Sequence, residues 1–207
     1  MPVLTGRLIR LEPLALEHAP GYLAAAGTGE DAAEVFRWIS HAAPETIEDA
    51  QAAILTALGD WARADRFAYA QFDVTTGDFA GTSSYYEINP ALRAIGIGHT
   101  WLGSRWWRTG HNTESKLLML THAFDTLGAA RVIWHTDIHN VRSQEAVARL
   151  GATREGELRK HRIRRDGSWR TSVQYSMTDD DWPAVRDRLT ERLAAGRRAV
   201  PGGGQPS

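Results

Sequence analysis

The sequence predicts a mixed α/β (α+β) domain, and two segments carry this prediction. Residues 67–74 and 79–88 alternate in polarity around a Thr-Thr-Gly-Asp turn, which is typical of an antiparallel hairpin. From residue 95 to residue 150, a strand, a turn, a helix, a strand and a second helix follow one another, the order of a parallel βαβα unit. The alternative is a doubly wound nucleotide-binding domain, whose all-parallel sheet would leave no place for a hairpin.

The composition indicates one ordinary globular domain. With 207 residues, the chain is long enough to bury an apolar core without metal or disulfide support. We expect residues 1–195 to form this domain and residues 196–207, which are rich in Gly and Pro, to form a disordered tail. The chain has no cysteine, which excludes disulfides, thiolate zinc sites and a cysteine nucleophile.

Charge and hydropathy limit the expected partners. The formal net charge of -1 gives no broad electrostatic reason to expect nucleic acid or an anionic membrane. The sequence shows neither a signal peptide nor an apolar stretch of about 18 residues, so we expect a cytoplasmic protein. Eight tryptophans favour an apolar pocket or a subunit contact, which leaves a homodimer open.

The first elements are a strand and two helices. Alternation over residues 7–12 predicts the strand, which Pro13 ends. Apolar residues at helical spacing between Leu16 and Ala26 predict one helix, and residues 46–64 predict another.

The strand over residues 95–102, which follows the hairpin, has one thin face. We expect large side chains on one face and small ones on the other: Ile95, Ile97, His99 and Trp101 against Gly96, Gly98 and Thr100. A thin face leaves room for a flat or extended ligand.

The remaining elements alternate again between helix and strand. Residues 112–127 predict a long helix, residues 131–136 a strand, and Asn140 caps a further helix that Gly151 ends. Residues 159–165 and 169–177 predict two strands joined by the two-residue turn Asp166-Gly167, and residues 182–195 predict the last helix.

The polar turn before the long helix has the composition of a phosphate site. Unpaired N–H groups at a helix start, together with the helix dipole, favour an anion, and two arginines can pair with it directly. The plainer alternative is an ordinary capped helix with solvated arginines. The candidate residues are Arg105, Arg108, Thr109, Gly110, His111, Asn112 and Thr113.

Three motifs in this order resemble the GNAT superfamily of N-acetyltransferases, and within it the RimJ/RimL type that modifies α-amino groups of ribosomal proteins. They are IGHTWL (97–102), RTGHNTE (108–114), and NVRS (140–143) with LGA (150–152). The resemblance covers residues 4–182. It implies a splayed sheet, acetyl-CoA as the acyl donor, no metal, and direct attack by a primary amine in a ternary complex.

The resemblance also implies where the cofactor binds. Backbone groups of Trp101 and Leu102 contact the pantetheine arm, Asn140 assists them, and Ser143 lies near the thioester sulfur. The pyrophosphate lies on the turn, where the family pattern is Q/R-x-x-G-x-G/A. In this chain Gly110 fits that pattern, while Trp107 and Asn112 depart from it.

The familiar catalytic side chains of the family are missing. The glutamate often used as base falls on Gly96, the tyrosine often used as acid falls on Val147, and a RimL-type glutamate falls on Arg162. Ser143 is our candidate for protonating the departing thiolate, and His99 is our candidate near the amine.

Three further residues are weaker candidates for a base: Glu87, Glu114 and His161. For Glu114 we prefer the interpretation that its carboxylate stabilises the helix N-terminus.

A missing base favours an acceptor with a low pKa. At pH 7 an α-amine is roughly 15% neutral and a lysine roughly 0.04%, a gap comparable to the contribution of a positioned base. We therefore favour an N-terminal α-amine or an activated small-molecule amine. The alternatives are an antibiotic or metabolite N-acetyltransferase and a non-catalytic acyl-CoA-binding module, because the expected acceptor segments, near residues 30–44 and in the C-terminal hairpin, carry no motif.

Two other signals are weaker. The eight histidines predict no metal site, because no pair at helical spacing lies beside a third ligand in the sequence. The basic run RKHRIRR (159–165) is expected in a solvated hairpin, or near the CoA 3′-phosphate or an acidic substrate.

Overall fold

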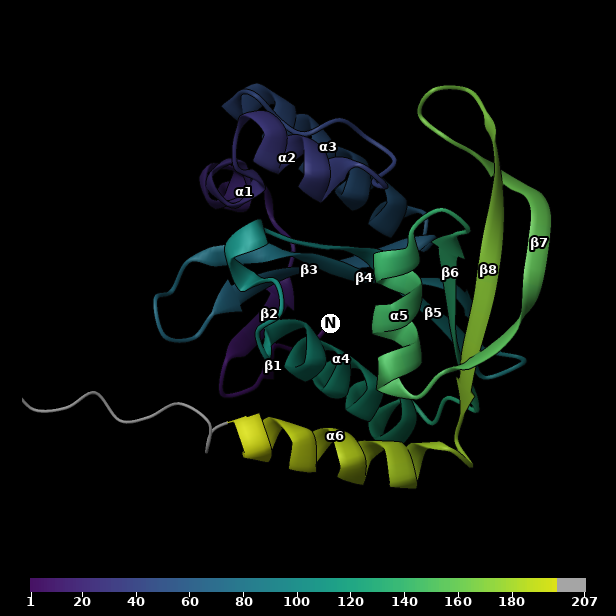
Figure 1. The fold of residues 1–207 in the computed structure, drawn as a ribbon. Coiled ribbons are helices and arrows are strands. Elements are labelled where there is room, and N and C mark those ends of the chain that lie inside the picture. The colour runs from purple at the N-terminus through teal and green to yellow at the C-terminus, as the bar shows by residue number, and fades with distance from the viewer. Residues whose placement is uncertain (197–207) are drawn as a thin grey trace, which may run out of the picture.

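An eight-stranded mixed sheet runs through the protein, with helices on both faces (Figure 1). The computed structural model describes residues 1–196, so most of the predicted tail lies outside the described residues. The strands are β1 (Leu4–Thr5), β2 (Ile9–Pro13), β3 (Arg66–Asp73), β4 (Phe79–Asn89), β5 (Ala94–Leu102), β6 (Arg131–Asp137), β7 (Thr153–Ile163) and β8 (Trp169–Thr178). The α-helices are α1 (Ala19–Ala26), α2 (Gly29–Phe36), α3 (Ile47–Ala62), α4 (His111–Thr121), α5 (Val141–Leu150) and α6 (Trp182–Gly196).

The strand order is β1-β2-β3-β4-β5-β6-β8-β7, and every neighbouring pair except one is antiparallel. The exception is the parallel pair of β5 and β6, which the crossover through α4 requires. This topology confirms the predicted mixed sheet and the βαβα unit, and it excludes the all-parallel alternative.

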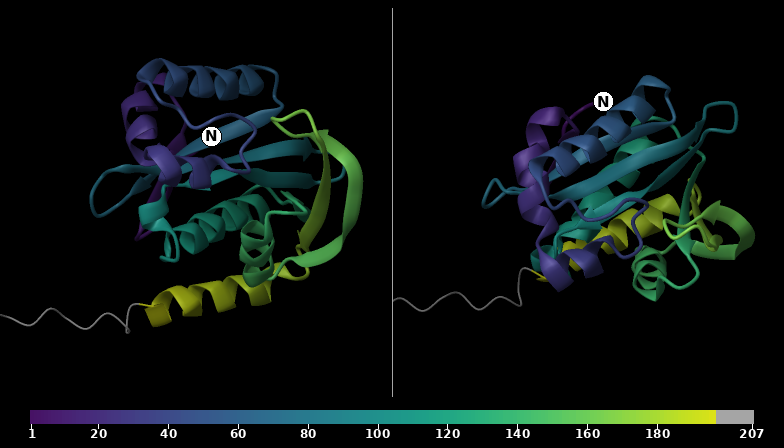
Figure 2. Two further views of the ribbon diagram at one scale, coloured as in Figure 1. Left: turned by 45° about the horizontal axis from the view of Figure 1, so that its top comes forward. Right: turned by 90° about the horizontal axis from the view of Figure 1, so that it is seen from above.

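The helices divide into two layers (Figure 2). Helices α1, α2 and α3 cover one face of the sheet, and α4 and α6 cover the other. Each layer has its own apolar core. The core under α4 and α6 includes Ile97, Met119, Leu120, Val132 and Leu189. The core under α1 to α3 includes Tyr22, Phe36, Ile54, Ala68 and Trp101.

Local signals explain where most helices begin and end. Thr46 and Asp49 form a capping box at the start of α3, and Asn140 caps α5, as expected. Helix α2 was not predicted, because eight residues give too short a pattern for helical periodicity to stand out. The predicted helix over residues 112–127 is divided into α4 and a π-helical turn, His122–Thr126.

The face assignment predicted for residues 95–102 is wrong beyond Ile97. The register between β4 and β5 shifts between Thr82 and Ser84, and His99 has a φ of 48°, so β5 contains a β-bulge. The bulge brings the ring of His99 against Tyr86, on the glycine side of the strand, and turns Trp101 into the core under α1 to α3. An extra residue in a strand reverses the alternation that follows it, and the sequence pattern does not show this.

Both predicted hairpins are present, but the C-terminal one differs in detail. Strand β7 begins at Thr153, and a three-residue turn joins it to β8: Arg164 and Ser168 pair through their backbones. Gly167 has a φ of 84°, the left-handed conformation that a three-residue hairpin loop needs at this position. The predicted two-residue turn is therefore longer by one residue.

Glu114 attaches the N-terminal strands to α4. Its buried carboxylate oxygen Oε2 accepts hydrogen bonds from the backbone N–H groups of Leu8, at 2.5 Å, and Ile9, at 2.9 Å. The carboxylate thus has a structural partner in the chain itself, which argues against a role as catalytic base.

Removing this carboxylate should destabilise the fold. In Glu114→Ala two backbone N–H groups lose their acceptor, and we expect the free energy of unfolding to fall by about 2–4 kcal/mol, measured by urea denaturation. Glu145→Ala removes an exposed glutamate of α5 that pairs only with Arg149, and should change stability by less than about 0.5 kcal/mol. Equal effects of the two substitutions would contradict the anchoring role.

Candidate active site

The candidate site starts where β5 and β6 part. Their pairing comprises three residue pairs and ends at Gly96 and Ile133, although both strands continue further. Beyond that point β6 pairs only with β8, as far as Asp137 opposite Ser172, among the described residues. The β6-facing edge of β5 is therefore open from Ile97 onward, and an extended chain with amide groups can lie there like an added strand.

The turn before α4 presents an anion-binding helix start. His111 is the first helical residue, so the N–H groups of His111, Asn112 and Thr113 have no partner one turn earlier in the helix, although the His111 N–H donates a 3.3 Å hydrogen bond to the Thr109 hydroxyl. The Thr109 hydroxyl, which lies 2.6 Å from the Trp106 carbonyl oxygen and 2.8 Å from His111 Nδ1, fixes the turn. Nε2 of His111 lies 3.2 Å from an Asp73 carboxylate oxygen, which fixes the turn against β3.

The two arginines of the predicted phosphate site have different surroundings. Arg108 is exposed and has a φ of 58°, directly before the helix start. Arg105 forms an ion pair with Asp78 in the β3–β4 turn, and its guanidinium lies 3.9 Å from the ring centre of Trp106. Arg105 is thus already paired, whereas Arg108 is exposed and precedes the first helical residue by three positions.

Arg142 is a cation of this region that sequence reasoning did not single out. Its guanidinium lies 3.9 Å from the ring centre of Trp107, the residue at the Q/R position of the family pattern. It also lies 3.6 Å from a carboxylate oxygen of Glu34 in α2. Helix α5 therefore places a positive charge beside Trp107, at the position where the family pattern has Gln or Arg. Arg142 stands inside the NVRS motif, but sequence alone does not show which residue it meets.

Gly110 is required by packing within the protein. A Cβ atom at this position would lie 2.6 Å from Cδ1 of Leu8 and 3.5 Å from Cδ2 of Leu193. The α-carbon therefore faces the N-terminal segment. A bulky residue here would displace Leu8, so substitution of Gly110 cannot by itself report on phosphate binding.

The other predicted cofactor residues lie on both sides of the parted strands. Trp101 is buried beside Tyr22, and the Leu102 carbonyl oxygen accepts a 2.7 Å hydrogen bond from the Trp107 indole. Across the gap, the Asn140 side chain accepts a hydrogen bond from the Ser143 N–H at the start of α5. Asn140 and Ser143 thus lie at the carboxyl end of β6.

His99 lies on the face of the sheet that α1 to α3 cover. Its ring centre is 5.5 Å from that of Tyr86. His99 is exposed at its surface, and crowding of its ring together with the positive charges of Arg66 and Arg162 lowers its pKa. The ring is therefore neutral at pH 7.

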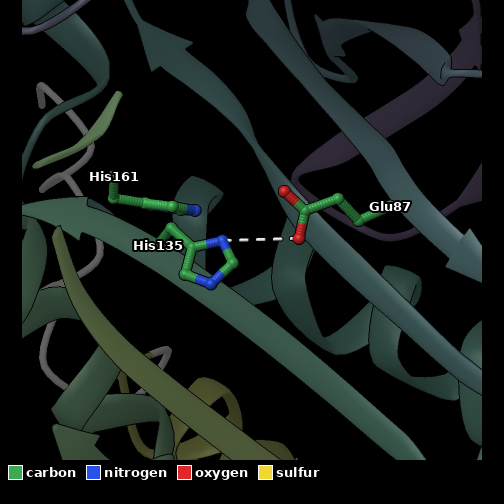
Figure 3. Close-up of side chains that lie close together, drawn as sticks. All are labelled: Glu87, His135 and His161. Atoms are coloured by element: carbon green, nitrogen blue, oxygen red, sulfur yellow. Dashed lines mark ion pairs between the residues drawn. The ribbon is translucent and has the colours of Figure 1, made fainter. Parts of the chain in front are cut away.

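A polar network beside His99 joins three strands (Figure 3). Glu87 of β4, His135 of β6 and His161 of β7 place one donor atom each within 4.8 Å of one another. His135 Nδ1 lies 3.5 Å from Oε2 of Glu87, and the rings of His135 and His161 are 4.7 Å apart. The network was not predicted, because its members come from distant parts of the sequence.

This network is poorly suited to a metal ion. Arg162 donates a 2.5 Å hydrogen bond to Oε1 of Glu87, and so neutralises the only carboxylate of the network. Arg170 also lies beside it, where its guanidinium donates to the His135 carbonyl oxygen at 3.1 Å. Two guanidinium groups oppose a divalent cation.

Lys116 supports the bulge of β5 from the face of the sheet that α4 covers. It is buried in α4, and its ammonium group contacts the hydroxyls of Ser83, at 2.6 Å, and Thr100, at 2.8 Å. Burial without a carboxylate partner lowers the pKa of Lys116 to about 7. Thr100 follows His99 directly, so the hydrogen bond from Lys116 holds the bulge of β5 against α4.

A half-open cavity of about 650 Å³ lies on the same side of the sheet as α1 and α2. Residues 42–45 and parts of both helices line it, and Arg165 of the C-terminal hairpin contributes to its wall. These are the segments in which the sequence placed the acceptor.

A parallel strand pair that parts beside an open helix start is the arrangement expected for an acyl-CoA-dependent acyltransferase. The family model described as "Acetyltransferase (GNAT) domain" matches residues 8–153, from β2 to the start of β7. The chain therefore belongs to the GNAT acetyltransferase family. Within residues 1–196, none of the helices is both long and apolar enough to cross a membrane.

Individual relatives agree with this membership. A GCN5-related N-acetyltransferase from Brucella melitensis is 30% identical, with a TM-score of 0.90 over 99% of this chain and 90% of that one. Mycobacterium smegmatis RimJ in complex with CoA-disulfide is 20% identical, with a TM-score of 0.75 over 95% of this chain and 94% of that one, which shows the shared fold.

A curated relative is the ribosomal protein uS5 alanine N-acetyltransferase of Escherichia coli (strain K12). It is 26% identical over 121 residues, which are 58% of this chain and 61% of that protein. The match thus spans about three fifths of the curated relative's length.

The stability of the protein should depend on pH through Lys116. Between pH 7 and pH 9 the unfolded chain keeps a proton on this lysine that the folded chain has released, so stability rises with pH. Relative to Lys116→Met, we expect the wild-type free energy of unfolding to increase by about 2 kcal/mol over this interval, measured by urea denaturation. Lys160→Met, at the exposed lysine of β7, is the matched control, and its free energy of unfolding should rise with pH as in the wild type.

Proposed function

We propose that this protein transfers an acetyl group from acetyl-CoA to a primary amine, by direct attack of the amine on the thioester in a ternary complex. The observation that carries the proposal is the parting of β5 and β6 after Gly96 and Ile133, next to the open N-terminus of α4. The presence of CoA-disulfide in the similarly folded Mycobacterium smegmatis RimJ supports CoA as the ligand.

The unpaired backbone groups at the start of α4 and along the edge of β5 indicate where the cofactor lies. The pyrophosphate lies against the N–H groups of residues 110–113, with Arg108 beside them and Arg142 as a second cation. The pantetheine arm runs along the open edge of β5, where backbone groups of Trp101 and Leu102 are its partners, and Asn140 borders it from the β6 side. Arg105 would take part only by exchanging its ion pair with Asp78 for a phosphate.

The chemistry then needs an acid for the thiolate and a place for the amine. Ser143, in the first turn of α5, is the proton or hydrogen-bond donor to the departing sulfur. His99 borders the amine on the opposite face of the sheet, where its neutral ring offers a hydrogen bond. Holding the amine against the thioester also accelerates the reaction by orientation alone.

For the acceptor we propose an N-terminal α-amine. The alanine N-acetyltransferase from Escherichia coli supports this choice, because its name records a ribosomal protein as its acceptor. The cavity beside α1 and α2 offers space for the residues that follow the amine. A small-molecule amine is the second candidate, since a cavity of this size also accepts a compact ligand.

An assay of free thiol release from acetyl-CoA tests the function and the acceptor together. At pH 7 we expect a peptide with a free α-amine to react roughly a hundredfold faster than the same peptide with a blocked N-terminus and one lysine, because far more α-amine is neutral. Mass spectrometry of the products identifies the acetylated nitrogen.

The same assay separates the alternatives. Release of thiol only with small amines would assign the protein to metabolite acetylation. Binding of CoA in calorimetry without acetylation of any amine in the panel would identify a non-catalytic acyl-CoA-binding module and refute the proposed activity.

Ser143→Ala tests the leaving-group donor. We expect kcat to fall by about 10²-fold, because the thiolate then leaves without its proton donor, with little change in the calorimetric affinity for CoA. Thr190→Ala removes a hydroxyl from the exposed face of α6 and should leave kcat unchanged. An unchanged kcat in Ser143→Ala would remove Ser143 from the mechanism.

A further inference from the structure

Tyr86 fills the place of the side chain that is missing at Gly96. A Cβ atom at Gly96 would lie 2.8 Å from Cε1 of Tyr86, and one at Gly98 would lie 2.7 Å from the same atom. The Tyr86 ring therefore occupies the space beside both glycines, at the point where β5 and β6 part. Its hydroxyl lies 3.1 Å from Nδ1 of His135, so the side chain spans from β4 across β5 to β6.

Hydrogen bonds fix which nitrogen of His135 carries the proton. The Gln174 amide nitrogen donates to the carboxylate of Glu155 at 2.8 Å, and a carboxylate can only accept. The amide oxygen of Gln174 therefore faces Nε2 of His135, at 3.1 Å, and Nε2 must be the protonated nitrogen. Nδ1 is left with a free lone pair, which points at the hydroxyl of Tyr86.

Charged groups surround Nδ1 of His135. Oε2 of Glu87 lies 3.5 Å from Nδ1, while Oε1 of the same carboxylate accepts a hydrogen bond from Arg162 and the Arg170 guanidinium donates to the His135 carbonyl oxygen. Desolvation lowers the pKa of the neighbouring His161, so at neutral pH that ring adds no opposing charge. Burial raises the pKa of Tyr86, which keeps its hydroxyl protonated and able to donate.

We propose that Tyr86 and His135 form the proton relay that replaces the missing glutamate base. The proposal rests on the acetyl transfer proposed above. The amine nitrogen forms a bond to the thioester carbon, and its surplus proton passes to the Tyr86 oxygen while the Tyr86 proton passes to Nδ1 of His135. The imidazolium that forms faces the Glu87 carboxylate, which it shares with Arg162, and the C–S bond then breaks to release the CoA thiolate.

This relay suits the task better than His99. No carboxylate among the described residues pairs with the His99 ring, whereas Nδ1 of His135 faces Glu87. His135 has a fixed tautomer, a donor on its free nitrogen and a carboxylate partner. In this arrangement His99 contacts the amine, and His135 takes up the proton.

Steady-state kinetics of three variants test the relay. We expect His135→Gln and Tyr86→Phe each to lower kcat about 10²-fold, with the KM for acetyl-CoA within twofold of wild type. Because the two groups act as one path, the double variant should be no slower than either single variant. His122→Gln, at a histidine of the π-helical turn, is the matched control and should keep the wild-type kcat.

The outcomes distinguish the relay from the activity itself. Wild-type turnover with full activity in His135→Gln would overturn the relay and leave the acetyltransferase intact. Multiplying losses in the double variant, or a loss of CoA affinity equal to the loss of kcat, would assign both residues a structural role. No turnover by the wild type would refute the proposed function.

Nuclear magnetic resonance of the histidine side chains gives a test that does not depend on activity. In the wild type without substrate, we expect His135 to carry its proton on Nε2. A proton on Nδ1 would overturn the relay, because Nδ1 could then accept nothing from Tyr86.

Discussion

The site depends on the short pairing of β5 with β6. Three residue pairs hold the two strands together, and then β6 follows β8 while β5 stays with β4. A bulge at His99 interrupts the register of β5, while β6 pairs with β8 along its whole length. Each strand is paired along its other edge, and the backbone groups of β5 that face the gap remain available to an extended ligand.

Buried polar side chains hold the two parts of this opening in place. Glu114 fastens the start of α4 to β2, and Lys116, half a turn further along the same helix, fastens it to the bulge of β5. Both groups are costly to bury, and each is stabilised by hydrogen bonds that only this register of helix and strands supplies. The phosphate end and the reacting end of the site are therefore fixed by one helix.

The proposed acid and the proposed proton relay lie on different sides of the sheet. Ser143 lies on α5 at the carboxyl end of β6, while Tyr86, His99 and His135 lie on the face toward α1 to α3. In the proposed mechanism, Ser143 as the acid for the thiolate and the Tyr86–His135 path for the proton of the amine thus act on the same thioester from opposite sides. On the face toward α1 to α3, Arg162 pairs with Glu87, and both Arg164 and Arg170 contact Asp137, so the arginines there outnumber these two carboxylates.

The sequence by itself determined the class of fold, the order of most elements and the turn before α4. These depend on periodicity, caps and turn residues, which are local properties of the chain. It also showed which catalytic side chains are absent, at Gly96, Val147 and Arg162. Only the tertiary structure shows which groups lie near these positions, and it is from these contacts that the relay is proposed. Tyr86, His135 and Gln174 meet across three strands, and Arg142 meets Trp107 across two elements. Such contacts follow from strand register and from the bulge at His99, which depend on pairing between distant segments and leave no local pattern in the sequence.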